Sequence, residues 1–97
     1  MEALIDLQYP YLKKIRFWKI DLQDEGVRSI CNYIEKVNSI EFLDLMDNNI
    51  TALGCEFLGK MFMGDKCNVI KFRIDNNPIG DEGMKKLAFG LRIHPKI

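Results

Sequence analysis

The sequence lacks most of the residues and charge patterns that mark catalytic and ligand-binding proteins. Its 97 residues include one histidine, and its three cysteines form no CxxC pair, so neither a zinc site nor a disulfide framework is indicated. The 14 basic residues balance the 14 acidic ones, which argues against a nucleic-acid or membrane-surface binder. No apolar run approaches the roughly 20 residues that span a bilayer. We expect reduced, buried thiols in an intracellular protein, with the cytoplasm as its location.

What the sequence does contain is one unit that occurs three times. Apolar residues or glycine fill six equivalent columns in every copy, with periods of 28 and 29 residues. The columns are Ile15, Leu43 and Phe72; Phe17, Leu45 and Ile74; Leu22, Ile50 and Ile79; Gly26, Gly54 and Gly83; Ile30, Leu58 and Leu87; and Ile34, Phe62 and Leu91. We therefore predict a single domain, 1–97, with units at about 12–39, 40–68 and 69–97, preceded by 1–11 as the remnant of another unit or a cap.

Each unit begins as a strand and continues as a helix. Ile15 and Phe17 alternate with residues that point the other way, which is the period of a strand with one buried face. Later apolar residues are spaced by about four, as in the pair Leu58 and Phe62, and this spacing predicts one face of an amphipathic helix. Because a helix separates successive strands, the strands are expected to lie parallel and adjacent, with every helix on the other side.

Residues at the helix ends are predicted to cap them. Asp24 and Asp81 stand just before their helices, where a carboxylate accepts backbone N–H groups of the first turn, and Thr51 is the cap candidate of the middle unit. His94 and Pro95 end the third helix, because proline cannot continue one. His94 has no partner cysteine or second histidine, so we interpret it as a surface loop residue.

The repeated unit resembles the leucine-rich repeat family, in particular its long ribonuclease-inhibitor-like subtype. The resemblance rests on IEFLDLMDNNITALGCEFLGKMF and VIKFRIDNNPIGDEGMKKLAFGL, and it extends over residues 12–97. It implies an α/β fold, a right-handed solenoid of about three strand–helix repeats with the parallel sheet on the concave face and the helices on the convex face. The Ile-Gly-Asp-Glu-Gly of the third unit is also similar to repeats of Ran GTPase-activating proteins and NOD-like receptors.

The resemblance also implies a role for two asparagines. In the family, one asparagine column carries a buried amide that bonds to backbone groups where each strand bends away, and Asn48 and Asn77 occupy that column. An amide donates and accepts at once, so stacked copies satisfy the loop backbone along the solenoid. The first unit has Ile20 in this column, which predicts an irregular repeat at that end.

No arrangement of residues typical of an enzyme is present. The glycines belong to the repeat and form no phosphate-binding loop after a strand. The acidic residues at the helix starts are explained by capping without catalysis. We therefore predict no enzymatic activity, no cofactor and no metal site.

The predicted binding surface is the side of the sheet that points away from the helices. Its side chains form columns across three strands, which stand about 4.8 Å apart. The columns are Lys14, Phe42 and Lys71; Arg16, Asp44 and Arg73; and Trp18, Met46 and Asp75. The second column alternates in charge and is interpreted as a cross-strand ion ladder, in which each exposed pair contributes about 1 kcal/mol or less.

Trp18, Phe42 and Met46 on this face allow two interpretations. Three large apolar groups on a solvated face form the kind of patch that binds a partner, and tryptophan is enriched at binding hot spots. Alternatively, the aromatic side chains pack on their own neighbours. In the first interpretation the basic residues around the patch favour a partner segment with an aromatic or aliphatic anchor and nearby acids.

The first functional hypothesis is a non-catalytic protein–protein interaction module, either an adaptor or an accessory subunit of a larger assembly. The alternative is a regulatory leucine-rich-repeat segment of a GTPase-activating protein or of a NOD-like sensor. Both hypotheses expect protein partners, with no nucleic acid, no membrane insertion and no small-molecule substrate. Because neither end shows a polar cap, we expect the chain to be part of a longer protein or of a complex.

Overall fold

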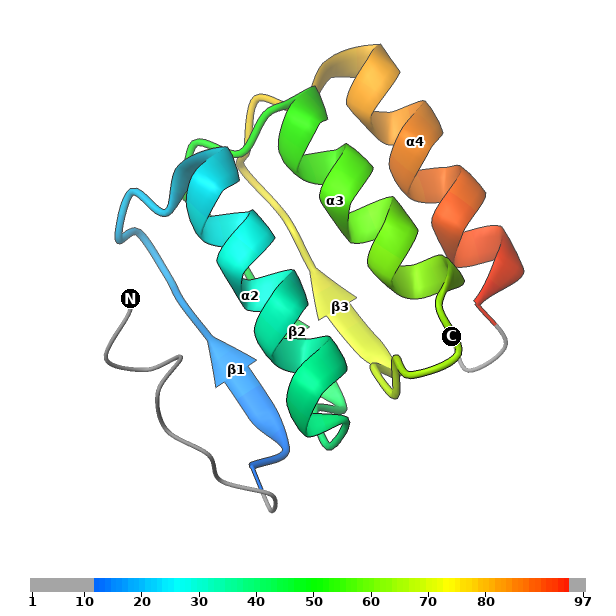
Figure 1. Ribbon diagram of the computed structural model, residues 1–97. Coiled ribbons are helices and arrows are strands. Elements are labelled where there is room, and N and C mark those ends of the chain that lie inside the picture. Colours follow the sequence, from blue (N-terminus) through cyan, green and yellow to red (C-terminus); the bar gives the residue numbers. More distant parts are fainter. Residues whose placement is uncertain (1–11, 95–97) are drawn as a thin grey trace.

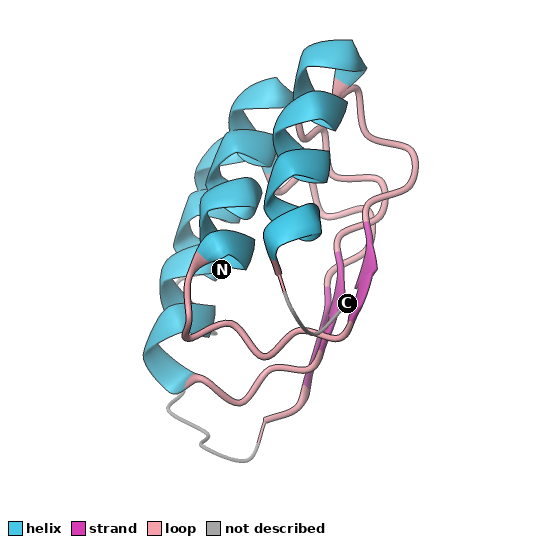
Figure 2. Ribbon diagram, turned by 90° about the vertical axis from the view of Figure 1, so that its right-hand side faces the viewer, coloured by secondary structure: helices cyan, strands magenta, loops and turns pink. Residues whose placement is uncertain are grey.

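The computed structural model describes residues 12–94, and within them the chain forms three successive strand–helix units (Figure 1). The elements are β1 (Lys14–Arg16), α2 (Gln23–Val37), β2 (Phe42–Asp44), α3 (Ala52–Met63), β3 (Lys71–Arg73) and α4 (Gly80–Ile93). The strands form a parallel sheet in the order β1-β2-β3, and the helices form a second layer on one side of it (Figure 2). The predicted α/β leucine-rich-repeat solenoid is confirmed.

The register of the sheet is the one that the repeat columns predict. Ile15 pairs with Leu43, and Leu43 pairs with Phe72. Backbone hydrogen bonds continue beyond the short strands, from Lys19 N to Met46 O (3.2 Å) and from Asp47 N to Asp75 O (3.1 Å). The parallel pairing therefore extends to the end of each strand-like segment and holds the whole concave face in register.

The hydrophobic core lies between the sheet and the helices. Its central residues come from the middle unit, where Leu43, Leu45 and Leu58 have no exposed surface. Phe62 of α3 is equally buried, and its ring meets the ring of Phe72 edge-on with the centroids 5.1 Å apart. Complete burial of a leucine or phenylalanine contributes about 1.5–3 kcal/mol each, so this layer is the main source of stability.

All three cysteines are buried, as the sequence predicts. Burial raises the pKa of the Cys31 thiol to about 12, with a smaller contribution from the Glu35 carboxylate. Burial likewise raises the pKa of Cys55 to about 11. Because the thiolate is the reactive form, both groups are inert thiols at neutral pH.

The helix starts differ from the prediction in two of three units. Thr51 is the N-cap of α3, as expected, and its hydroxyl accepts a hydrogen bond from Leu53 N. The N-cap residues of α2 and α4 are instead Leu22 and Ile79, and neither makes a side-chain cap. The prediction that Asp24 and Asp81 cap their own helices is therefore wrong: the N-cap of each helix lies two residues before the aspartate, so both carboxylates already lie in the first turn.

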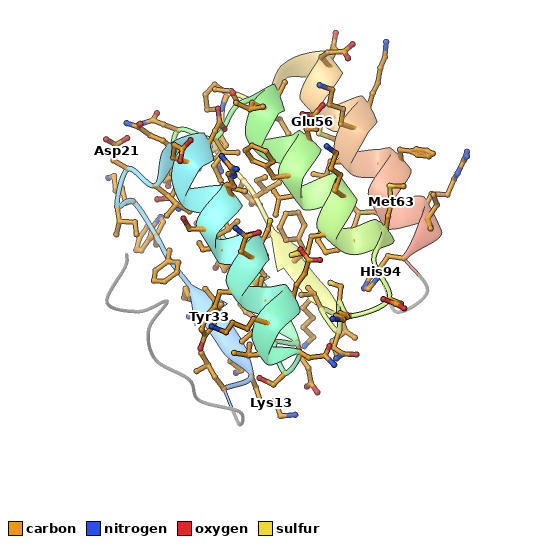
Figure 3. All side chains as sticks on the ribbon, viewed as in Figure 1. Lys13, Asp21, Tyr33, Glu56, Met63 and His94 are labelled. Carbon is orange, nitrogen blue, oxygen red and sulfur yellow. The ribbon has the colours of Figure 1, made fainter. Side chains whose placement is uncertain are left out.

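The interpretation of His94 as a surface residue is also wrong. His94 is only 3% exposed and lies directly after α4 (Figure 3). Its Nε2–H donates to the carbonyl of Val69 over 2.7 Å, and its ring packs on Phe62 with the centroids 5.4 Å apart. The histidine thus fastens the end of α4 to the start of the third unit.

No helix among residues 12–94 combines the length and the apolar character needed to cross a membrane.

Candidate protein-interaction surface

The nine predicted site residues come from the three strands and the residues just after them. We call the sheet surface that points away from the helices the concave face. The register places Lys14 beside Phe42 and Phe42 beside Lys71, and it places Asp44 between Arg16 and Arg73. Side chains two apart along a strand share a face, so Trp18, Met46 and Asp75 continue the same surface beyond the strand ends.

At the amino ends of the strands, the concave face has a basic cavity built around an aromatic ring. The Phe42 ring is half-buried, and two cations lie over it: Lys14 Nζ is 5.9 Å and Arg16 Cζ 5.4 Å from its centroid. A cavity of about 210 Å³ opens here, and its lining residues are Lys13, Lys14, Glu41, Phe42, Ile70 and Lys71. The lysines outnumber the single glutamate, which already pairs with Lys13 over 3.3 Å. The cavity is therefore suited to an anionic group beside an apolar one.

Ile70 is a member of this cavity that sequence reasoning missed. It is 47% exposed, although it stands beside the buried Val69 in an apolar run. The backbone N–H groups of Ile70 and Lys71 both donate to the Glu41 carbonyl, so the chain makes a turn as it enters β3, as Glu41 and Phe42 do on the Lys13 carbonyl before β2. This turn directs Ile70 to the solvent, and periodicity alone gives no signal for it.

The centre of the concave face is occupied by paired charges. Asp44 is only 4% exposed; its Oδ2 lies 3.5 Å from Arg16 Nε, and its Oδ1 accepts a hydrogen bond from Met46 N over 3.2 Å. Arg73 pairs over 3.1 Å with Asp75, two residues further along the chain and beyond the end of β3, and this hydrogen bond lowers the pKa of the Asp75 carboxyl. Of the predicted ion ladder, the Arg16–Asp44 pair forms between strands, whereas Arg73 pairs with Asp75 of the neighbouring column.

At the carboxyl ends of the strands, Trp18 dominates the surface. Its side chain is 59% exposed, and its indole N–H donates to Asp47 Oδ2 over 2.9 Å. This bond fixes the ring and satisfies its polar atom, so a large apolar face remains open to solvent. Met46, in the neighbouring segment, is half-buried. The concave face therefore has two apolar sites, at Phe42 and at Trp18, with the Arg16–Asp44 pair between them.

Asn48 and Asn77 hold the loops above this face. The Asn48 side chain accepts hydrogen bonds from Ile20 N (3.0 Å) and Leu22 N (3.4 Å) and donates to Phe17 O and Met46 O. The Asn77 side chain repeats this arrangement one unit later, accepting from Asn48 N and Ile50 N and donating to Leu45 O. Each amide thus serves the loop of the unit before it. Ile20 stands at the equivalent position without breaking this chain of bonds, because Asn48 satisfies its backbone.

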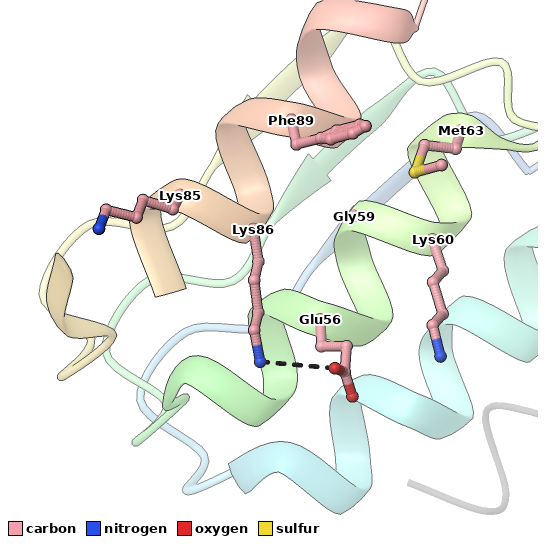
Figure 4. A pocket seen from close by; sticks show the side chains of 7 residues that line it. All are labelled: Glu56, Gly59, Lys60, Met63, Lys85, Lys86 and Phe89. Atoms are coloured by element: carbon pink, nitrogen blue, oxygen red, sulfur yellow. Dashed lines mark hydrogen bonds and ion pairs between the residues drawn. The ribbon is translucent and has the colours of Figure 1, made fainter. Parts of the chain in front are cut away.

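A second hollow lies on the convex side, between α3 and α4. Its volume is about 310 Å³, and it is lined by Glu56, Gly59, Lys60, Met63, Lys85, Lys86 and Phe89 (Figure 4). A Cβ on Gly59 would lie 2.7 Å from the Lys86 carbonyl oxygen, so glycine is what allows the two helices to approach so closely. Lys86 pairs with Glu56 across the hollow over 3.4 Å. Among residues 12–94, no group of three or more histidine, cysteine or acidic residues is placed to hold a metal ion.

The parallel strand–helix units and their amide-bonded loops define a class of protein. A family model described as "Leucine Rich repeat" matches residues 38–59 and 66–88, which lie for the most part in the second and third units. Together with the fold, this match makes the chain a leucine-rich repeat protein.

A human protein, "NACHT, LRR and PYD domains-containing protein 14", is 33% identical to the chain over 86 residues. The aligned region covers 88% of this chain but only 8% of that protein. The chain is therefore similar to a small part of a much longer repeat-containing protein.

Proposed function

We propose that this chain is a non-catalytic protein-binding module that recognises its partner with the concave face. The observation that carries the proposal is Trp18, whose side chain is 59% exposed on a face that is otherwise organised by paired charges. Tryptophan is the residue most typical of binding hot spots, and a fixed ring loses little conformational freedom when a partner covers it. Protein–protein interaction is also the usual role of leucine-rich repeats.

The charges of the face favour an acidic partner segment. Of its six charged residues among the nine site residues, four are basic, and the two acids already have arginine partners. The cavity at Phe42 adds an apolar site next to Lys14 and Lys71. We therefore propose a segment in extended conformation with one apolar anchor at Trp18, a second at Phe42, and acidic residues between or beside them.

The test combines capture of partners with measured binding. Wild-type chain and the Trp18→Ser/Met46→Ser double variant are used as baits, and each captured protein is then purified and titrated against both. We expect saturable binding to the wild type that weakens by about 2 kcal/mol or more in the double variant, with thermal midpoints within a few degrees of each other.

The matched control is Leu53→Ser/Met84→Ser, which replaces an exposed leucine and an exposed methionine on the helices. It is expected to leave binding unchanged. If this control weakens binding and the concave variant does not, the contact surface lies on the convex side. If the concave variant unfolds, Trp18 is required for folding and the binding proposal loses its basis.

A second candidate function is favoured by the comparison with the NACHT-, LRR- and PYD-containing protein. In this case the chain is a repeat segment of a NOD-like sensor, the alternative to an independent adaptor. The gene distinguishes the two: a full-length transcript that encodes a NACHT domain together with these repeats supports the sensor, whereas a transcript limited to a few repeats supports the adaptor.

We also infer that the units have the boundaries 12–39, 40–68 and 69–97 and are of the ribonuclease-inhibitor-like subtype. Two features support this: each unit carries a full helix of 12 to 15 residues, and equivalent strand residues recur at the spacing of the repeat columns. Limited proteolysis should cut between the proposed units, near Ser39 and Asn68, before it cuts within a helix.

A further inference from the structure

The hollow between α3 and α4 has a backbone floor and apolar walls. A Cβ on Gly90 would lie 2.6 Å from the Gly59 carbonyl oxygen, and a Cβ on Gly59 would lie 2.7 Å from the Lys86 carbonyl oxygen. The two helix backbones are therefore in direct contact, and this contact fixes the floor. Met63 of α3 and Phe89 of α4 point toward one another above it (Figure 4), and they are 48% and 46% exposed. The hollow is thus preformed, with an apolar side chain on each wall.

The charged residues that line this hollow are mostly basic: Lys60, Lys85, Lys86 and Glu56. Lys60 stands three residues before Met63 on α3, and Lys86 stands three residues before Phe89 on α4. Three residues of helix rise about 4.5 Å, so each wall has a cation one turn toward the amino end of its helix from the apolar residue. Glu56 pairs with Lys86 over 3.4 Å. The lining therefore has three positive charges against one negative charge, and the negative one is already paired.

The equivalent positions on α2 and α3, one unit earlier, have a different chemistry. Glu35 and Lys60 stand there in place of the apolar pair. The charged residues of this set are two acids and two bases, so their charges cancel: Arg28, Glu35, Glu56 and Lys60. Phe57, the aromatic residue of the set, packs partly against the core, and Arg28 Cζ lies 6.0 Å from the centroid of its ring. A basic hollow with two apolar walls is therefore a property of the α3–α4 pair and not of the repeated unit.

We infer that the α3–α4 hollow binds an acidic amphipathic helix of a partner protein. An apolar side chain of that helix inserts between Met63 and Phe89, and an acidic side chain one turn away pairs with Lys60. A helix is the suitable form, because its side chains repeat at the same one-turn spacing that separates the lysines of the hollow from the apolar pair. The excess of basic residues selects acids on the partner. The inference goes beyond the function proposed for the concave face and does not depend on it.

The test uses the full chain and a designed helix as the probe. The probe is an alanine-based peptide of about 15 residues, long enough to form a helix, with leucines along one face and glutamates one turn to either side of them. Its control peptide has glutamine in place of every glutamate. We expect saturable binding of the acidic peptide, and binding of the glutamine peptide that is weaker by roughly fivefold or more at low salt, where charges are least screened.

Amide chemical shifts of the isotope-labelled chain locate the bound peptide. We expect the largest changes at Gly59, Lys60 and Phe89, and unchanged shifts at Trp18 and Phe42 on the concave face. This measurement separates the inference from the function proposed above, because each predicts changes on a different side of the molecule.

The apolar walls are tested with Met63→Ser/Phe89→Ser, which should weaken binding of the acidic peptide by roughly tenfold or more. The matched control is Leu53→Ser/Met84→Ser. It also replaces one exposed apolar residue on α3 and one on α4, but neither of them lines the hollow. This control should leave the affinity within about twofold of the wild type.

The charge is tested with Lys60→Glu, which keeps the inference testable even if the serine variant fails to fold. Lys36→Glu is its matched control, because Lys36 and Lys60 are each the basic residue in the last turn of a helix and both are exposed. Both reversals therefore disturb the helix dipole equally. Lys60→Glu should weaken the acidic peptide by roughly fivefold and leave the glutamine peptide unchanged, whereas Lys36→Glu should affect neither peptide.

Three outcomes would overturn the inference. The first is no saturable binding of the acidic peptide at millimolar concentration. The second is a set of shift changes at Trp18 and Phe42 in place of those around Phe89, which would assign the acidic segment to the concave face. The third is that the chain does not bind the peptide but sediments with phosphatidylserine vesicles, and that Met63→Ser/Phe89→Ser abolishes this sedimentation. An anionic bilayer would then be the occupant of the convex side.

Discussion

The middle and third units have nearly the same pattern of residues and very different environments. Leu45 has no exposed surface, whereas its equivalent Ile74 is partly exposed. The same holds for Phe62 and Leu91. Both units place their apolar side chains toward the helices, so the difference comes from the neighbour that the middle unit has on each side. In a solenoid, burial is a property of the position in the stack as much as of the sequence.

The largest expected effect tests this difference directly. Leu45→Ala or Leu58→Ala should destabilise the protein by about 2–5 kcal/mol, because each leaves a cavity in the covered part of the core. Ile74→Ala removes as many carbon atoms from a partly exposed site and should cost about 1 kcal/mol. Chemical denaturation measures all three. Equal losses for Leu45→Ala and Ile74→Ala would show that the third unit is as well covered as the middle one.

Among the asparagines too, replacing a buried residue should cost more stability than replacing an exposed one, and the losses should be smaller than those for the leucines. Asn48→Ala leaves the buried Leu22 N–H and the partly buried Ile20 N–H without their acceptor, and we expect a loss of about 2–3 kcal/mol. Asn32→Ala is the control, because Asn32 is exposed in the middle of α2, where alanine fits the helical backbone. If both substitutions cost the same in urea unfolding, the buried amide has no special role.

The two carboxylates at the helix starts provide a third comparison. Asp24→Ala should cost about 0.5–2 kcal/mol, because it removes the carboxylate that accepts hydrogen bonds from Thr51 N and Gly54 N at the start of α3, in addition to the Thr51 cap. Asp81→Ala should cost close to nothing in the 97-residue chain. Thermal unfolding of both variants measures the two losses of stability. A larger loss for Asp81→Ala than for Asp24→Ala would show that the Asp24 carboxylate does not stabilise the start of α3.

The smallest effect concerns local opening of the third unit. Cys55 lies under α4, since a Cβ on Gly83 would be 3.3 Å from its sulfur, whereas Cys31 belongs to α2 and to the core cluster. Both thiols have raised pKa values, so native-state labelling at pH 8 should be slow. Because the last unit is covered on one side only, Cys55 should react roughly tenfold faster than Cys31. Mass spectrometry of labelled peptides measures the two rates, and the reverse order would place the weaker unit at the other end.

The sequence predicts the fold of this chain well because its signal is local and repeated. Alternation in the strands and a spacing of four in the helices set the register, and Ile15, Leu43 and Phe72 pair as their column predicts. Thr51 caps its own helix for the same reason, since the donor lies two residues away. Features that depend on a few neighbouring residues are readable before the structure is known.

Features that depend on residues one unit away are not readable in the same manner. Asp24 reaches α3 and not its own helix, and His94 is buried because Val69 lies beneath it. Asp44 was predicted on an exposed face, but Arg16 and the Met46 backbone enclose its carboxylate. In each case the partner is found only when the units are stacked. The concave residues themselves are in register, while their use in binding remains a prediction.

The contact between the Asp24 carboxylate and the Thr51 hydroxyl, at the start of α3, has a consequence for folding. Similar repeats can stack in the wrong order, and a chain that skipped its middle unit would place units 1 and 3 side by side. Asp24 would then meet Asp81 in place of Thr51, with two like charges and no hydroxyl donor. We therefore expect this contact to favour the native order of the units over one that places units 1 and 3 side by side.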